Sequence, residues 1–366
     1  MSAETAAGPR LGRRGFLAGA GASALGAAGL LLASCGDDDE PRAGVAPTSE
    51  PDPLQPRRGG ILRTAGGPVG TILDIHRAKA IPESLVWQWV GNFLMRYSAS
   101  APYLVEPDLA KAQPEIPGDG TLLVFQLRPE AKWQDRPPVG ARPVTAEDVK
   151  ASFDRIKALA QKSPRSGNYS NVESVTAVDA ATVQFKLRQP QADLLAIMAD
   201  QYDLVIPKEL AARGDDAITG RGDVIGSGPY ELTVFDPGRR AQLRRRADGH
   251  WKPNTAWLDG WDFFSVTDDG QRANALFGGQ ADVAEVPPVL ARLFEQDPAY
   301  QVLRATTPAR ECLLINHAVG PAKDPRVRMA ISRAIDRRGV YGTVLEGAGV
   351  VGGPMTPAAV AWALPE

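Results

Sequence analysis

Short strand and helix patterns alternate along most of this 366-residue chain, and this alternation restricts its fold more than any other feature. Beyond residue 226, strand patterns at 230–234 and 261–266 are followed by helical periodicity at 271–277 and 289–296. Elements that alternate in this way build layers of helix and sheet around a core. We therefore expect a mixed α/β protein.

Two helices are expected before residue 226. Ser84 is a suitable N-cap, and the apolar residues after it have helical spacing, with Trp89 on the apolar stripe and Trp87 off it. Thr145 and Asp148 resemble a capping box that opens the second helix. Both helices should pack one apolar face against the core.

A β-hairpin is predicted around the turn Asp236-Pro237-Gly238. Its return strand carries five arginines, which could bind an anion or form a solvated outer face. Charges spread along one exposed strand favour the solvated face. The five are Arg239, Arg240, Arg244, Arg245 and Arg246.

The chain has only two cysteines, Cys35 and Cys312. If Cys35 carries a lipid, no intramolecular disulfide can form. Cys312 begins an apolar stretch that ends at Asn316 and predicts a buried strand, so we expect a structural cysteine. Asp324-Pro325 then predicts the start of a helix whose apolar residues, among them Val327, face inward.

Residues 1–34 have the order of a bacterial signal peptide. Arg13 and Arg14 precede an Ala/Gly/Leu-rich stretch and resemble a twin-arginine signal, whose cargo is exported already folded. A transmembrane helix is the alternative, because the apolar stretch is almost long enough to span a bilayer. Its glycines and the acidic run after it disfavour that alternative.

Leu32-Ala33-Ser34-Cys35 resembles a lipobox, in which the cysteine becomes acylated. We predict lipid attachment at Cys35, which would anchor the protein at the extracytoplasmic face of the cell membrane, on the periplasmic or cell-wall side. Residues 35–58 lack periodicity and predict a disordered tether. The protein body beyond this tether should be soluble.

Charge and motif content argue against several function classes. Residues 1–34 carry a net charge of +2, so without them the formal charge moves from −2 to −4, which argues against a nucleic-acid partner. The three histidines lack zinc-site spacing, and no nucleophile elbow, P-loop or dinucleotide fingerprint is present. We predict no catalytic residues, no metal and no cofactor, and a binding protein in preference to a hydrolase.

Blocks along the whole ordered chain resemble, in order and spacing, the peptide/nickel/oligopeptide solute-binding proteins of ABC importers, the extracellular family 5. No single block is specific alone, but their shared order is. The blocks are Gly59-Gly60-Ile61-Leu62-Arg63, Pro107-Asp108-Leu109-Ala110, Val124-Phe125-Gln126-Leu127-Arg128, Thr145-Ala146-Glu147-Asp148-Val149, Gly226-Ser227-Gly228-Pro229-Tyr230 with His250-Trp251, Gly278-Gly279-Gln280-Ala281-Asp282-Val283, Asp324-Pro325-Arg326-Val327-Arg328 and Ala334-Ile335-Asp336-Arg337.

The resemblance implies a two-lobed, periplasmic-binding-protein-like fold of type II, cluster C. Lobe I would cover residues 59–262 and a partial lobe II residues 263–366. Members of the family continue beyond the block that matches Gly352 to Pro357. We therefore expect a C-terminally truncated chain with an incomplete second lobe.

The resemblance also implies a function: capture of peptides or similar small solutes and their delivery to an ABC transporter permease, by a monomer without enzymatic activity. By position, Gly67, Val69, Gly70, Thr71 and Tyr169 would face the ligand cleft, or else serve the structure alone. The alternatives are an exported hydrolase, or a truncated or degenerate binding protein with a sensory role or no transport role. The sequence does not name the solute.

Overall fold

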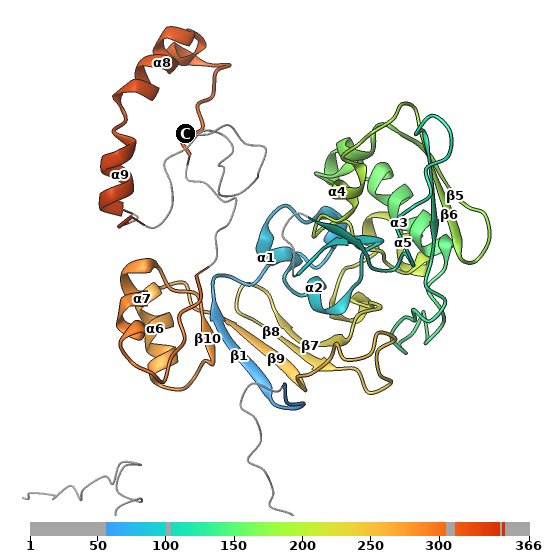
Figure 1. The fold of residues 1–366 in the computed structure, drawn as a ribbon, viewed down its shortest axis with the longest axis horizontal. Helices are drawn as coiled ribbons and strands as arrows, with labels where there is room; N and C mark the ends of the chain where they lie inside the picture. Colours follow the sequence, from blue (N-terminus) through green and yellow to red (C-terminus); the bar gives the residue numbers. More distant parts are fainter. Residues whose placement is uncertain (1–55, 100–103, 305–311, 345, 348–366) are drawn as a thin grey trace, which may run out of the picture. The chain divides into compact units, whose positions relative to one another are not determined.

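The computed structural model describes residues 56–99, 104–304, 312–344 and 346–347 (Figure 1). The chain divides into two units between Gln55 and Pro56, and every described residue belongs to the second. Arg13, Arg14 and Cys35 lie outside the described residues. The predicted signal peptide and lipid attachment therefore stay predictions.

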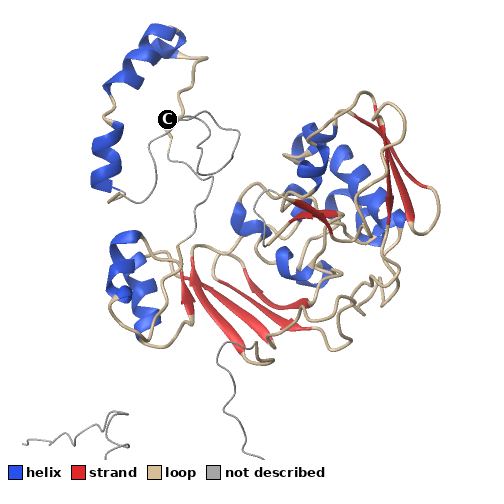
Figure 2. Cartoon of the chain, in the orientation of Figure 1, coloured by secondary structure: helices blue, strands red, loops and turns tan. Residues whose placement is uncertain are grey.

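A five-stranded mixed sheet has the strand order β10-β1-β9-β8-β7 (Figure 2). Strand β1 lies between two parallel neighbours, β9 and β10, whereas β7, β8 and β9 pair antiparallel. β9 spans the predicted lobe boundary between residues 262 and 263, so both predicted parts contribute to one sheet. The strands are β1 (Ile61–Gly66), β7 (Tyr230–Asp236), β8 (Arg240–Arg245), β9 (Gly260–Ser265) and β10 (Val283–Ala284).

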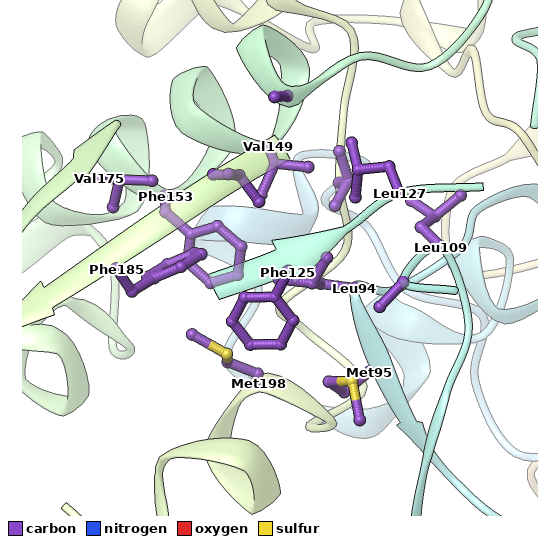
Figure 3. Close-up of a cluster of buried hydrophobic side chains, with 14 of the residues drawn as sticks. Leu94, Met95, Leu109, Phe125, Leu127, Val149, Phe153, Val175, Phe185 and Met198 are labelled. Atoms are coloured by element: carbon purple, nitrogen blue, oxygen red, sulfur yellow. The ribbon is translucent and has the colours of Figure 1, made fainter. Parts of the chain in front are cut away.

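A second sheet has the antiparallel order β4-β6-β5 and packs against the long helix α3. Phe125 and Phe185 from this sheet meet Phe153 from α3 in a buried cluster (Figure 3). Ring centroids lie 5.5 Å apart for Phe125 and Phe185 and 5.0 Å apart for Phe153 and Phe185, with edge-to-face geometry. The elements are β4 (Leu122–Gln126), β5 (Val172–Ala177), β6 (Thr182–Leu187) and α3 (Ala146–Ala158).

Shorter elements connect and cover these sheets, and α6 packs against β1 and β10 (Figure 1). No helix of the described residues is long and apolar enough to cross a membrane. The remaining strands and helices are β2 (Met95–Tyr97), β3 (Val105–Pro107), α1 (Ile81–Ser84), α2 (Trp87–Val90), α4 (Leu194–Met198), α5 (Lys208–Ala211), α6 (Asp269–Phe277), α7 (Pro288–Glu295), α8 (Pro325–Ala334) and α9 (Arg337–Val344), with short 3-10 turns that include η2 (Ile75–Arg77) and η4 (Ser166–Tyr169).

The predicted capping box and hairpin are confirmed. At the start of α3 the Thr145 amide donates to Asp148 Oδ2 at 2.8 Å, and the Thr145 hydroxyl donates to the same oxygen at 3.1 Å. β7 and β8 pair around the predicted turn, with Asp236 opposite Arg240. Local patterns that need no distant partner therefore predicted these elements well.

The helix predicted from Ser84 is wrong in two respects. Ser84 is the last residue of α1 and donates its hydroxyl to the Ile81 carbonyl, so it caps no helix. Trp87, expected off the apolar stripe, is fully buried, and its indole N–H donates to the Leu73 carbonyl at 2.7 Å. The structure has two short helices, α1 and α2, where the prediction assumed one continuous helix.

One of the five hairpin arginines does not belong to a solvated face. Arg246 is only 6% exposed, and its guanidinium donates to Asp248 and to the Trp133 carbonyl. Arg244 and Arg245 form ion pairs with aspartates, whereas Arg239 is 81% exposed. Aspartates therefore neutralise most of this row, which disfavours an anion site there.

The two predictions near the C-terminus are also corrected. Cys312 is exposed, and residues 312–316 form no strand with any described residue. The expected cap of α8 is present, since Asp324 accepts from the Arg326 amide at 2.8 Å. However, no residue of α8 is buried, because its apolar residues, among them Val327, do not pack closely on the described part of the chain.

The glycines of the 226–228 block allow α2 to pack closely. A Cβ on Gly226 would lie 1.8 Å from the Val90 carbonyl oxygen, whereas a Cβ on nearby Gly222 would meet nothing within 4 Å. We expect Gly226→Ala to lower the free energy of unfolding by about 1–3 kcal/mol, because α2 must shift. Gly222→Ala should change it by less than about 0.5 kcal/mol. Urea unfolding measures both, and equal midpoints would contradict this packing account.

Candidate functional site

The parallel strands β10, β1 and β9 end at the same edge of their sheet. The segments that follow them, residues 67–74, 266–268 and 285–287, therefore share that edge; we call them the strand-end loops. Ligands of open α/β sheets bind outside the carboxyl ends of the strands. This edge is the candidate functional site.

Glycines fix the path of the loop after β1. A Cβ on Gly66 would lie 2.6 Å from the Phe263 ring, and one on Gly70 would lie 2.5 Å from the Cα of Glu83. The Gly70 amide donates to the Pro82 carbonyl at 3.1 Å, which ties the loop to α1. A Cβ on Gly67, by contrast, would meet nothing within 4 Å, so the backbone there is open to an approaching molecule.

The predicted ligand-binding residues differ in their surroundings. Thr71 is exposed, whereas Val69 is 2% exposed and packs into the core beneath the loop. Tyr169 is fully buried in a different core cluster, and its hydroxyl donates to Asp203 Oδ2 at 2.9 Å. Ligand contact by these residues stays a prediction, and the exposed Thr71 and the partly exposed Gly67 suit it best.

Arg272 joins the other two strand-end loops. From α6, its Nη1 donates to the Val266 carbonyl at 2.8 Å, and its Nε donates to the Glu285 carbonyl at 2.7 Å. An ion pair with Asp269 holds the guanidinium in place. Sequence reasoning missed Arg272, because both carbonyl partners belong to loops without a motif.

A buried polar group anchors the segment that follows the first loop. Arg155 of α3 binds Asp74 through two hydrogen bonds of 3.0 and 2.5 Å, and it donates to His76 Nδ1 at 3.0 Å. His76 Nε2 then donates to the Leu204 carbonyl at 2.9 Å. Burial, and then the charge of Arg155, lower the pKa of His76 to about 4, so the imidazole is neutral near pH 7.

The sequence blocks that carry the family resemblance contact one another. Arg63 of β1 forms a bidentate pair with Asp282, 219 residues away, with bonds of 2.6 and 3.0 Å. Asn92 donates to Asp108 and accepts from Ser227 Oγ at 2.9 Å, which links two further blocks. Burial raises the pKa of Asp108. These blocks therefore stabilise the frame around the site.

Two cavities in the described part of the chain lie away from the strand-end loops. One cavity of about 590 Å³ lies between α3 and α5, and one of about 360 Å³ lies beside η4 and the start of α4. Neither includes a residue of the strand-end loops. Among the described residues, no group of three His, Cys, Asp or Glu side chains could hold a metal ion.

Comparisons with solved structures identify the class of protein. The chain is similar to the periplasmic binding protein DppA from Helicobacter pylori in complex with the peptide STSA, with a TM-score of 0.71 and 22% identity, over 82% of this chain and 61% of that one. It is also similar to AgaA in complex with agropinic acid from A. tumefacien R10, with a TM-score of 0.69 and 25% identity, over 80% of this chain and 57% of that one. The fold is that of the two-lobed periplasmic binding proteins.

The family follows from the sequence itself. Residues 105–366 match the family model of bacterial extracellular solute-binding proteins, family 5, and the chain belongs to this family. Protein XP55 of Streptomyces lividans is 30% identical over 67% of this chain and 43% of its own length. The glutathione-binding protein GsiB of Shigella flexneri is 27% identical over 68% of this chain and 47% of its own length. The chain thus spans about half the length of the curated relatives it matches.

The buried pair between Arg155 and Asp74 provides a test of how the first loop is anchored. Arg155→Met leaves Asp74 as an uncompensated buried carboxylate, so we expect a loss of about 3–5 kcal/mol in the free energy of unfolding. Lys150→Met, on the same helix, removes an exposed partner of Asp154 and should cost less than about 1 kcal/mol. Chemical unfolding compares the two variants, and similar losses would refute the anchoring role.

Proposed function

We propose that this chain is an extracytoplasmic lipoprotein that binds peptides or similar small solutes and delivers them to an ABC-type import permease. Family membership over residues 105–366 is the observation that carries the proposal. Among similar proteins, GsiB is a glutathione-binding protein and DppA was solved with a peptide. Glutathione and the peptide both contain amide bonds, which supports a small amide-containing ligand for this chain.

The strand-end loops offer the chemistry that such a ligand needs. Backbone amides and carbonyls near Gly67 can pair with a peptide backbone without selecting its side chains. The exposed hydroxyl of Thr71 adds one donor and one acceptor. A ligand that contacts two lobes would favour the closed state by the difference between its affinities for the closed and open forms.

The predicted anchor at Cys35 fits this function. A diacylglycerol on the cysteine supplies two acyl chains, which are sufficient for stable membrane attachment. Residues 35–58 would then act as a flexible tether that keeps the binding protein at high local concentration near its permease.

Ligand titration tests the binding function directly. The full chain, exported and purified, is titrated with glutathione and with a mixture of short peptides while tryptophan fluorescence is recorded. We expect a saturable change with one ligand per chain, and recovery of the ligand unchanged in mass. Turnover of the ligand would instead indicate a hydrolase, and absence of saturable binding would contradict the proposal.

Two glycine variants localise the binding to the first strand-end loop. Gly70→Ala forces the loop away from α1, so the affinity should fall at least about tenfold, which corresponds to about 1.4 kcal/mol. Gly67→Ala introduces a methyl group into open space and should leave the fold intact. Equal affinity of Gly70→Ala and wild type would place the ligand elsewhere.

Lipid attachment has its own test. In cells fed with an alkyne-labelled fatty acid, the wild-type chain should incorporate the label and fractionate with membranes, because Cys35 is acylated. Cys35→Ala should lose both properties, whereas Cys312→Ala, which removes the other cysteine of the chain, should retain them. Labelling of Cys35→Ala at the wild-type level would disprove this anchor.

A further inference from the structure

A buried acid and a buried tyrosine pair beneath the turn η4. The Tyr169 hydroxyl donates to Asp203 Oδ2 at 2.9 Å, and both residues are 0% exposed. The other carboxylate oxygen, Oδ1, accepts no hydrogen bond from a described residue. Nothing in the proposed function uses this pair, and buried carboxyl groups are usually better satisfied.

The surrounding charges are close to Asp203 but do not pair with it. The groups that act on its carboxyl are Tyr169, Arg165 just before η4, and Asp200 just after α4. The guanidinium carbon of Arg165 lies 4.2 Å from the centroid of the Tyr202 ring, and its Nη2 lies 3.7 Å from Asp200. The Nε of Arg165 is buried and donates to no described acceptor.

This arrangement makes ionisation of Asp203 costly. Burial raises the pKa of Asp203 to about 7 from an ordinary value of 3.8, so the carboxyl is largely protonated in mildly acidic solution. As the pH rises through neutrality, a negative charge appears where a single hydroxyl solvates it. A buried charge without an ionic partner favours any rearrangement that supplies water or a cation.

The pair also holds the turn η4, which forms part of a cavity wall. The Tyr169 ring packs against Phe153 of α3, with centroids 5.2 Å apart, and anchors one end of η4 to the core. Gly167, Asn168 and Ser170, which flank the anchor, line the cavity of about 360 Å³ described above. Release of Tyr169 would therefore change one wall of that cavity.

We propose that Tyr169 and Asp203 form a proton-controlled latch, which holds η4 against the core while Asp203 is protonated and loosens it when Asp203 ionises. The Asp203 carboxyl releases its proton to solvent. The carboxylate then attracts the Arg165 guanidinium away from Asp200, toward the unpartnered Oδ1. Because Arg165 adjoins η4, its movement displaces the turn.

The sign of the pH dependence follows from linkage. In the loosened state water and the Arg165 guanidinium solvate the Asp203 carboxylate, so its pKa falls to its ordinary value or below, and this state binds fewer protons between about pH 4 and pH 7. The equilibrium constant for loosening therefore rises about tenfold per pH unit up to about pH 7 and is constant above it. The latch is tightest in acid.

Native-state hydrogen exchange of the amides in residues 166–170 tests the latch, with rates corrected for the intrinsic pH dependence of exchange. Between about pH 5 and pH 7 we expect the opening constant of the wild type to rise about a hundredfold and then level off. Asp203→Asn should show no such rise, because its amide does not titrate. Asp200→Asn, the matched control, should retain the rise.

Two further results decide between a latch and a general loss of stability. Amides of α3 and β6 should exchange more slowly than those of η4, since the opening is local. Tyr169→Phe removes a hydrogen bond that lowers the pKa of Asp203, so the plateau should begin at a higher pH. A flat wild-type profile, an Asp203→Asn variant that keeps the rise, or η4 amides that exchange only with the core would each overturn the proposal.

Discussion

The pairing of β1 with two strands from the far part of the chain is the constraint on which the rest of the structure depends. Residues 61–66 pair in parallel with residues 260–265, and Thr64 and Ala65 also pair with residues 283–284. Parallel strands need a connection that crosses over, and here the connection is nearly two hundred residues long. The whole α3 layer is contained in that connection. A loop of this length costs only modestly more entropy than a short one, because the cost grows with the logarithm of length.

Two ion pairs join parts of the chain that are far apart in the sequence. Arg63 with Asp282 secures β1 to β10, and Arg155 with Asp74 secures α3 to the segment after the first loop. The first pair is partly exposed, so it contributes little to the free energy of unfolding but orients the two strands. The second pair is buried, and removing one partner would destabilise the protein strongly. The frame therefore positions the strand-end loops. The sequence blocks that carry the family resemblance therefore belong to the frame around these loops.

The sequence predicted what depends on nearby residues. The capping box at Thr145, the hairpin near Pro237 and the helix start at Asp324 all use partners within a few positions. Where the partner is distant, prediction failed or was silent. The buried indole of Trp87 donates to the Leu73 carbonyl, 14 residues earlier, and the buried guanidinium of Arg246 donates to the Trp133 carbonyl, 113 residues earlier.

The candidate site was predicted in part for the same reason. A glycine-rich loop after a strand indicates close backbone approach, and the structure shows which glycines need it, Gly66 and Gly70, and which leaves open space, Gly67. Arg272 gave no signal, because the carbonyls that it binds have no sequence signature.

For Tyr169, the role that the family resemblance predicts differs from the contacts that the side chain makes. Its place in the sequence predicted contact with a ligand. In the structure its hydroxyl donates a hydrogen bond to Asp203 and its ring packs against Phe153. A residue held in this way can still influence a binding surface, because its flanking residues Gly167, Asn168 and Ser170 form the wall of a cavity. Burying an acid with one donor is unfavourable for stability at neutral pH, and a more apolar side chain would pack there at less cost. An ionisable group at this place under a surface turn therefore suits control of that turn better than stabilisation of the core.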